Sequence, residues 1–270
     1  MTSTGPEERE KAHTWARVAR QGFADSARYL GSLPESEWNG PTGCAKWTVR
    51  DLAGHIAGEA VWYPNLVRGV TRGEVPIPNE EYERLKTLSG AELTQRIEEA
   101  AMEIEQSIAE ASPEELQQLV SLGWMKVPLW RSVFISATEA VLHDRDAKVP
   151  REGIVTIPTE WAVAVADPWV DTCSQLAHKD GIDACPGSYL LQVGDGIGPV
   201  TVVAQDGQLT TRRGESGTPQ MTLHVTADQF LRLTAGRLDL NGEEGRDIQV
   251  TGDRDRALCL NRIFAGIANG

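Results

Sequence analysis

The sequence lacks the long apolar runs and the basic charge that mark two large classes of protein. No apolar run in its 270 residues approaches the ~20 residues that a membrane span needs. Lysine and arginine total 26 against 39 aspartates and glutamates, so the formal net charge is -13. This charge argues against nucleic acid and anionic membranes as general partners. The N-terminus is polar and acidic, unlike a signal peptide, so we expect a cytoplasmic protein.

Cysteine is scarce, and no two of the four cysteines form a CxxC pair or a metal-finger spacing. In a cytoplasmic chain, this scatter predicts free thiols that are mostly buried. Cys44 precedes a predicted helix and is the one candidate for a nucleophile. A small buried thiol is nevertheless the commoner state for such a residue, so we favour a buried Cys44 and keep a nucleophilic Cys44 as the alternative.

The first half of the chain has the apolar periodicity of four long helices. We predict them over about 8–33, 48–68 and 90–109, with a fourth that begins after Pro128. Thr48 and Asp51 have the spacing of a capping box, Trp47 is placed as a hydrophobic staple, and Gly69 is a candidate stop. Inward apolar stripes and short connections favour a four-helix bundle.

The pattern changes near residues 148–156. Strand-like runs separated by turn signals follow, at about 188–193, 198–205, 208–212, 221–225 and 247–251. Helices are predicted over about 159–176, 227–235 and 253–268, with Thr226 as a cap and Gly236 as a stop for the second of them. We therefore expect a mixed two-domain chain: an all-helical domain over 1–150, and an α+β domain with a mostly antiparallel sheet over 151–270.

Three residues in the helical half suggest a metal site. Glu139 and His143 are four apart on a predicted helix, so they share one face. His55 lies among apolar residues of another predicted helix, where an unpaired imidazole would be costly. Two imidazoles and one carboxylate with open positions are typical of a catalytic rather than a structural metal site. The alternative is a core histidine and a surface Glu–His pair.

Other acidic residues flank this set. Asp144 and Asp146 are candidate hydrogen-bond acceptors for the second nitrogen of a ligating imidazole. Glu59 lies one helical turn after His55, where it could be a fourth ligand, a catalytic base or a solvated carboxylate.

The segment from Trp47 to Ile56, WTVRDLAGHI, resembles the second-helix signature of the mycothiol-dependent maleylpyruvate isomerase family. This family belongs to the DinB-like metal-binding helical bundles, and the segment EAVLHDRD from Glu139 to Asp146 resembles its second metal motif. The resemblance implies that His55, Glu139 and His143 hold a divalent metal, taken to be zinc, and that mycothiol is a cosubstrate.

The second half supports this resemblance separately. Residues 226–238, TADQFLRLTAGRL, and 250–253, VTGD, resemble the end of a sterol-carrier-like domain, which many family members carry after the bundle. The resemblance implies an active-site role for Arg237, which could hold a substrate carboxylate. The chain departs from the isomerases after Arg237, where a strand and a helix are predicted in place of a tail rich in proline and tryptophan.

These observations lead us to expect a metalloenzyme that uses a small thiol. The thiolate would add to an electrophilic substrate, as in maleylpyruvate cis–trans isomerisation, in a monomer or small homo-oligomer. A mycothiol S-transferase or thiol-exchange enzyme is the first alternative. A metal-dependent hydrolase without thiol, with Glu59 as base, and a non-catalytic protein that binds a small ligand are the others.

Overall fold

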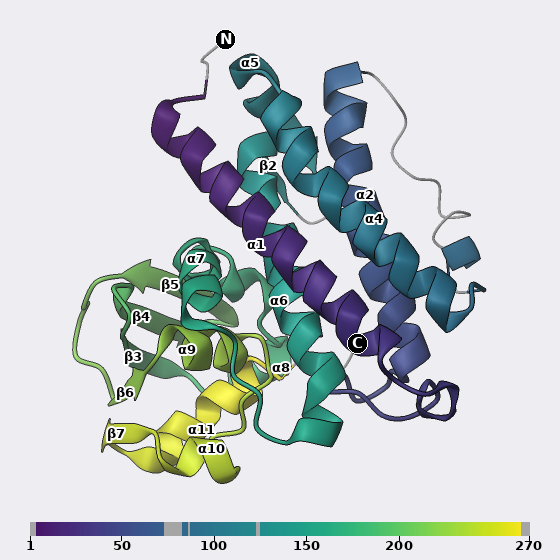
Figure 1. The fold of residues 1–270 in the computed structure, drawn as a ribbon. Coiled ribbons are helices and arrows are strands. Elements are labelled where there is room, and N and C mark those ends of the chain that lie inside the picture. Colours follow the sequence, from purple (N-terminus) through teal and green to yellow (C-terminus); the bar gives the residue numbers. More distant parts are fainter. Residues whose placement is uncertain (1–3, 73–82, 86, 123–124, 266–270) are drawn as a thin grey trace. The chain divides into compact units, whose positions relative to one another are not determined.

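The computed structural model describes residues 4–72, 83–85, 87–122 and 125–265. The chain divides into two compact units, one formed by 1–42 with 47–153 and the other by 43–46 with 154–270. The first unit is mostly helical and the second contains a five-stranded sheet (Figure 1), which confirms the predicted order of a helical region and a sheet-containing region. No helix within the described ranges has the length and apolar character that crossing a membrane requires.

Four long helices form the core of the first unit: α1 (Pro6–Gly31), α2 (Val49–Arg72), α4 (Gly90–Glu110) and α6 (Leu129–Glu152). Helix α1 packs on α4 and α6, and α2 packs on the same two helices. The rings of Trp15 and Trp130 stack with centroids 5.9 Å apart. Gly22 lets α1 approach α6 closely, because a Cβ atom there would lie 2.9 Å from the Cβ atom of Ala140.

Helix α2, which carries His55, begins as predicted and ends later than predicted. The backbone N–H of Thr48 donates to Asp51 Oδ2 (2.9 Å), and the N–H of Asp51 donates to Thr48 Oγ1 (3.2 Å), so the capping box forms. The prediction that Gly69 stops the helix was wrong. A helical glycine costs only about 1 kcal/mol, and ion pairs from Arg68 and Arg72 tie the last turns to α4. The predicted loop with Pro76 and Pro78 lies outside the described residues.

The sequence prediction missed several short elements of the first unit. These are the 3-10 helix η1 (Glu35–Glu37), helix α5 (Pro113–Leu116) and an antiparallel pair, β1 (Leu119–Ser121) and β2 (Lys126–Pro128). Each has only three or four residues, which is too few for hydrophobic periodicity to become visible.

The sheet of the second unit has the strand order β5-β4-β3-β6-β7. Its strands are β3 (Gly187–Val193), β4 (Gly198–Gln205), β5 (Gln208–Arg213), β6 (Met221–Val225) and β7 (Gln249–Gly252). Every pairing is antiparallel except that of β3 with β6. Buried Leu191 lies opposite Val200 and Leu223, so one face is apolar. His224, which alternates with Leu223 and Val225 along β6, is exposed.

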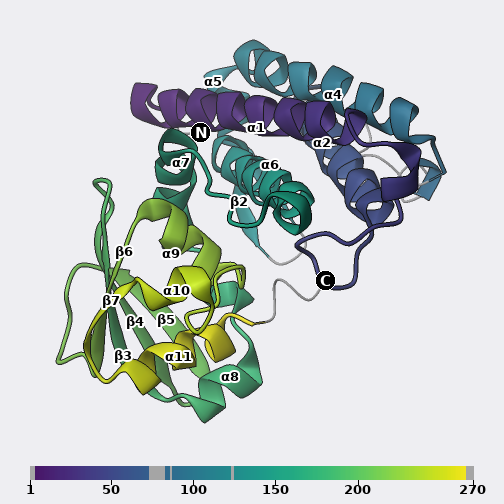
Figure 2. The ribbon, with the colours of Figure 1, turned by 60° about the horizontal axis from the view of Figure 1, so that its bottom comes forward.

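Helices α8 (Lys179–Ala184), α9 (Ala227–Thr234) and α11 (Arg254–Ile263) pack against this sheet (Figure 2). Thr226 caps α9, and Gly236 follows it with a φ of 72°, as predicted. The predicted helix over 159–176 is two elements, α7 (Thr159–Trp169) and the 3-10 helix η2 (Cys173–Leu176). Helices α8 and α10 (Glu243–Arg246) were not predicted. The closing helix ends at Ile263, and its predicted end, 266–268, lies outside the described residues.

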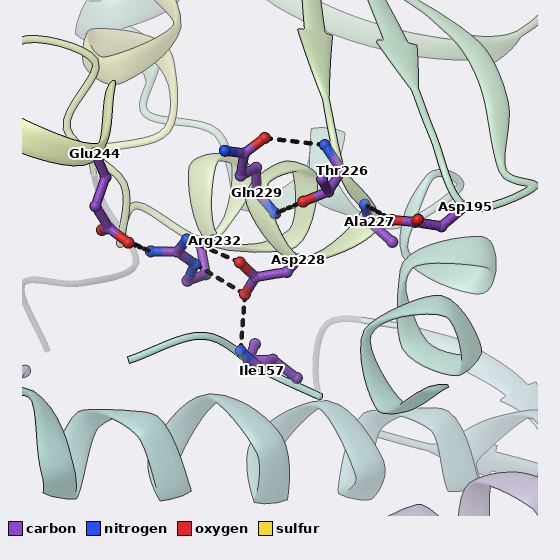
Figure 3. A network of polar contacts seen from close by, with 8 residues as sticks. All are labelled: Ile157, Asp195, Thr226, Ala227, Asp228, Gln229, Arg232 and Glu244. Carbon is purple, nitrogen blue, oxygen red and sulfur yellow. Dashed lines mark hydrogen bonds and ion pairs between the residues drawn. The ribbon is translucent and has the colours of Figure 1, made fainter. Parts of the chain in front are cut away.

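A closed network of charges joins parts of the second unit (Figure 3). The guanidinium of Arg232, which is 1% exposed, donates from Nε and Nη2 to the two carboxylate oxygens of Asp228 at 2.9 and 2.8 Å. Its Nη1 donates to both oxygens of Glu244 at 2.9 and 2.8 Å. Asp228 Oδ1 also accepts the backbone N–H of Ile157 at 3.0 Å. The network therefore ties α9 to α10 and to the segment that precedes α7.

Candidate metal centre

One carboxylate oxygen faces two imidazoles between α2 and α6. Glu139 Oε2 lies 3.4 Å from Nε2 of His55 and 3.0 Å from Nε2 of His143. Ligand atoms of these three residues all lie within 4.8 Å of one another. The four-residue spacing places Glu139 and His143 on one face of α6, and the packing of α2 on α6 brings His55 to it. The structure thus brings together the three predicted metal ligands.

The arrangement fits a small divalent cation. Two atoms bound to zinc at 2.0–2.2 Å in a tetrahedral site are about 3.4 Å apart, close to the 3.4 and 3.0 Å separations in this site. A neutral imidazole has only one N–H, and a carboxylate only accepts hydrogen bonds. A cation in contact with Glu139 Oε2 and both Nε2 atoms would satisfy lone pairs that converge on one point.

Asp146 fixes the orientation of His143 from behind. Its Oδ2 lies 3.0 Å from His143 Nδ1, and the Asp146 side chain is fully buried. If Nδ1 carries the proton and donates to Asp146, the Nε2 lone pair is directed toward Glu139 and the ligand point. The neighbouring candidate, Asp144, instead accepts from Lys148 Nζ at 2.6 Å, so only Asp146 makes the expected contact with this imidazole.

The site is charged and open on one side. Burial alone would raise the pKa of the Glu139 carboxyl, but hydrogen bonds with His143 and then His55 hold this pKa well below its usual range. The side chains of His55 and Glu139 are 23% and 32% exposed, whereas that of His143 is 8% exposed. This exposure leaves access for a ligand on the His55 and Glu139 side.

The ring of Trp47 packs beside both imidazoles. Its centroid lies 4.8 Å from that of His55 and 5.7 Å from that of His143. Sequence reasoning placed Trp47 only as a staple before the helix cap. A contact with His143, nearly a hundred positions later, has no local sequence signal.

The roles predicted for Glu59 and Arg237 stay predictions. Glu59 is partly exposed on α2, and it is not among the described residues whose ligand atoms converge with His55. Arg237 belongs to the second unit, where its Nη1 donates to the carbonyl oxygen of Ala235 at 2.9 Å.

The fold of this chain resembles that of known proteins. Two crystal structures resemble the chain: a mycothiol-dependent maleylpyruvate isomerase, and a variant of that enzyme with one histidine replaced by alanine. Each has a TM-score of 0.61 and 18% sequence identity, covering 93% of this chain and 96% of the other. These structures support the fold. Among curated protein sequences, none matches significantly.

Residues 19–148, which include His55, Glu139 and His143, match the family described as mycothiol maleylpyruvate isomerase N-terminal domain. The match spans α2 and α6, the two helices that carry the candidate metal ligands. Through residues 19–148, the chain therefore belongs to the mycothiol maleylpyruvate isomerase N-terminal domain family.

Proposed function

We propose that this protein is a mycothiol-dependent metalloenzyme that isomerises an unsaturated keto-acid of the maleylpyruvate type. The helical unit would be a DinB-like metal-binding four-helix bundle, and the second unit a sterol-carrier-like domain. One observation carries the proposal: Glu139 Oε2 faces Nε2 of both His55 and His143, and the second nitrogen of His143 faces buried Asp146. Membership of the N-terminal domain family supports the choice of thiol and reaction.

The residues of the site have separate tasks in this proposal. His55, Glu139 and His143 would hold the cation, and Asp146 would keep Nε2 of His143 free of its proton. A zinc ion held there would act as a Lewis acid and would lower the pKa of a bound thiol. The exposed edge of His55 and Glu139 would admit the thiol and the substrate.

The isomerisation itself requires reversible thiol addition. The mycothiol sulfur adds to one carbon of the cis double bond, which leaves a single bond that can rotate. Elimination then restores the double bond in the trans configuration and releases the thiol unchanged. Arg237 would hold a substrate carboxylate by two parallel hydrogen bonds, and Glu59 would serve as a proton-transferring group.

A mycothiol S-transferase is the second candidate. The observation that favours it is the chain after Arg237, where β7 and α11 replace the tail expected of an isomerase. Transfer would use the same thiol and the same metal ligands, but the new carbon–sulfur bond would persist in the product.

Incubation of the zinc-supplemented protein with mycothiol and maleylpyruvate separates these outcomes. A trans product with free thiol, seen by NMR, supports the isomerase, and a thioether found by mass spectrometry supports the transferase. Turnover that needs no thiol would favour the hydrolase, for which Glu59→Gln must then abolish activity. Less than about 0.1 equivalent of metal after supplementation would contradict every metalloenzyme version.

A further inference from the structure

Two of the four cysteines lie on the helices α8 and α11, which contact each other in the second unit. Cys185 is the C-terminal cap of α8, and Cys259 lies in the middle of α11. Two hydrogen bonds bracket this contact. The backbone N–H of His178 donates to the carbonyl oxygen of Ile263 at 2.7 Å, and Arg256 Nη1 donates to the carbonyl oxygen of Pro186 at 3.3 Å. The segment 178–186 and α11 therefore run side by side in opposite directions.

The backbones of the two helices touch between these hydrogen bonds. A Cβ atom at Gly181 would lie 2.1 Å from the carbonyl oxygen of Arg262, so only glycine fits there. On α11, Arg256, Cys259 and Arg262 recur every three residues and share one side. Because the first and last of these lie against 178–186, Cys259 faces the same segment, toward Cys185 at its end.

The two thiols differ in access. Cys185 is buried, and Cys259 is partly exposed. Burial raises the pKa of the Cys185 thiol to about 11, and the neighbouring Cys259 thiol contributes to that rise. The Tyr189 hydroxyl lies beside this pair and donates to the carbonyl oxygen of Cys185 at 2.8 Å. A partly exposed thiol near a buried one has the arrangement of an attacking and a resolving cysteine.

We propose that Cys259 and Cys185 form a redox-responsive pair that a low-molecular-weight disulfide converts to an intramolecular disulfide between α11 and α8. This modification site lies outside the proposed function and does not depend on it. Cys173 differs from this pair, because its thiol is buried and donates to a backbone acceptor, the carbonyl oxygen of Val170, at 3.8 Å. It therefore serves as the control cysteine below.

The chemistry proceeds by two exchanges. The Cys259 thiolate attacks one sulfur of the disulfide RSSR, which forms a mixed disulfide and releases one thiol RSH. The Cys185 sulfur then attacks the Cys259 sulfur, loses its proton and releases the second RSH. The protein is oxidised by two electrons, RSSR is reduced to two RSH, and the Cys185–Cys259 bond replaces the small-molecule disulfide bond.

Glutathione disulfide is the probe for this proposal, followed by alkylation and non-reducing peptide mapping of the full chain. We expect the peptides that contain Cys185 and Cys259 to become linked, with the loss of two hydrogen atoms and reversal by dithiothreitol. The cross-link should raise Tm by on the order of 5 °C, because it constrains the unfolded chain. Cys173→Ser should form the same cross-link as the wild type.

The two single variants identify the role of each thiol. Cys185→Ser should accumulate a glutathione adduct on Cys259, whereas Cys259→Ser should form neither adduct nor cross-link. A wild-type protein that stays fully reduced would overturn the proposal, and so would one that accumulates only a stable adduct on Cys259. Both of these outcomes are read on the wild type and do not require that either variant fold.

Discussion

Each unit gathers carboxylates around nitrogen donors, but only the second unit completes the cluster with its own residues. In the Arg232 network, a permanently charged guanidinium donates to all four carboxylate oxygens of Asp228 and Glu244. At the candidate metal centre, carboxylate oxygens of Glu139 and Asp146 face the nitrogens of imidazole rings, which are neutral unless protonated. We infer that the Arg232 network is arranged to stabilise the fold and that the candidate metal centre is arranged to receive a cation.

Donor counts explain this difference. Arginine has five N–H donors and stays charged, so a buried network around it can be complete without any ligand. A neutral histidine has one donor and one lone pair, and His143 has a carboxylate oxygen 3.0 Å from each ring nitrogen. One of those contacts requires an added proton or a metal ion. The two clusters also differ in the access to their centres: the Arg232 side chain is 2% exposed, whereas the side chains of His55 and Glu139 are 23% and 32% exposed.

Loss of a ligating imidazole should have the largest effect. We expect His55→Ala to weaken zinc binding by at least ~1000-fold and to abolish thiol-dependent turnover, since a site with two protein ligands holds the ion poorly. Competition with a chromophoric chelator measures the affinity, and far-UV circular dichroism checks that the helices remain. His224→Ala, which removes an exposed imidazole of β6, is the matched control and should change neither property. Retained metal in His55→Ala would remove His55 from the site.

Breaking the closed network should lower stability instead of metal binding. Arg232→Met leaves the carboxylates of Asp228 and Glu244 without their cation, which should reduce the free energy of unfolding by about 3–5 kcal/mol. Urea denaturation measures this loss.

Arg213 supplies the control for Arg232, because it pairs with Asp167 while both side chains are about half exposed. Arg213→Met should cost no more than about 1 kcal/mol. Equal losses in the two variants would contradict the contrast between a buried and an exposed pair. A change in zinc affinity in Arg232→Met would contradict the division of tasks between the two clusters.

Asp146→Asn should have an intermediate effect on the metal centre. An amide can hold the wrong tautomer of His143, so we expect zinc affinity to fall about 10–100-fold while the ligands remain. Asp144→Asn, two residues earlier and paired with Lys148, should change this affinity less than about threefold. Isothermal titration compares the two variants. Equal affinities in both would show that the buried carboxylate of Asp146 has no role in orienting the imidazole.

Local sequence patterns predicted those parts of the fold that depend on neighbouring residues. The capping box of Thr48 and Asp51 and the bounds of β4 and β6 follow from turn chemistry and alternation within a few residues. The end of α2 did not follow, because ion pairs to α4 carry the helix past Gly69. Such long-range contacts outweigh the modest local preference of one glycine against a helix.

The two clusters differ in how much of each the sequence could reveal. The spacing of Glu139 and His143 places them on one helical face. Their pairing with His55 depends on helix packing, which the apolar surroundings of His55 and the family resemblance indicated but the spacing did not. Asp228 and Arg232 have the same four-residue spacing, which was a usable signal for an ion pair. Their burial and their contact with Glu244 come from tertiary structure. The sequence spacing alone therefore could not distinguish an exposed ion pair from a buried network.

The smallest expected effect on zinc affinity comes from replacing Trp47, whose ring packs beside the two imidazoles of the candidate metal centre. Trp47→Leu removes ring contacts to His55 and His143 worth about 0.5–1.5 kcal/mol, so zinc affinity should fall between twofold and tenfold. Trp62→Leu on α2, where the ring faces Tyr63, is the matched control and should leave the affinity unchanged. If Trp47→Leu binds zinc as tightly as the wild type, the Trp47 ring is not needed to hold the imidazoles of His55 and His143 in place. A loss as large as that of His55→Ala would instead mean that Trp47 is needed to assemble it.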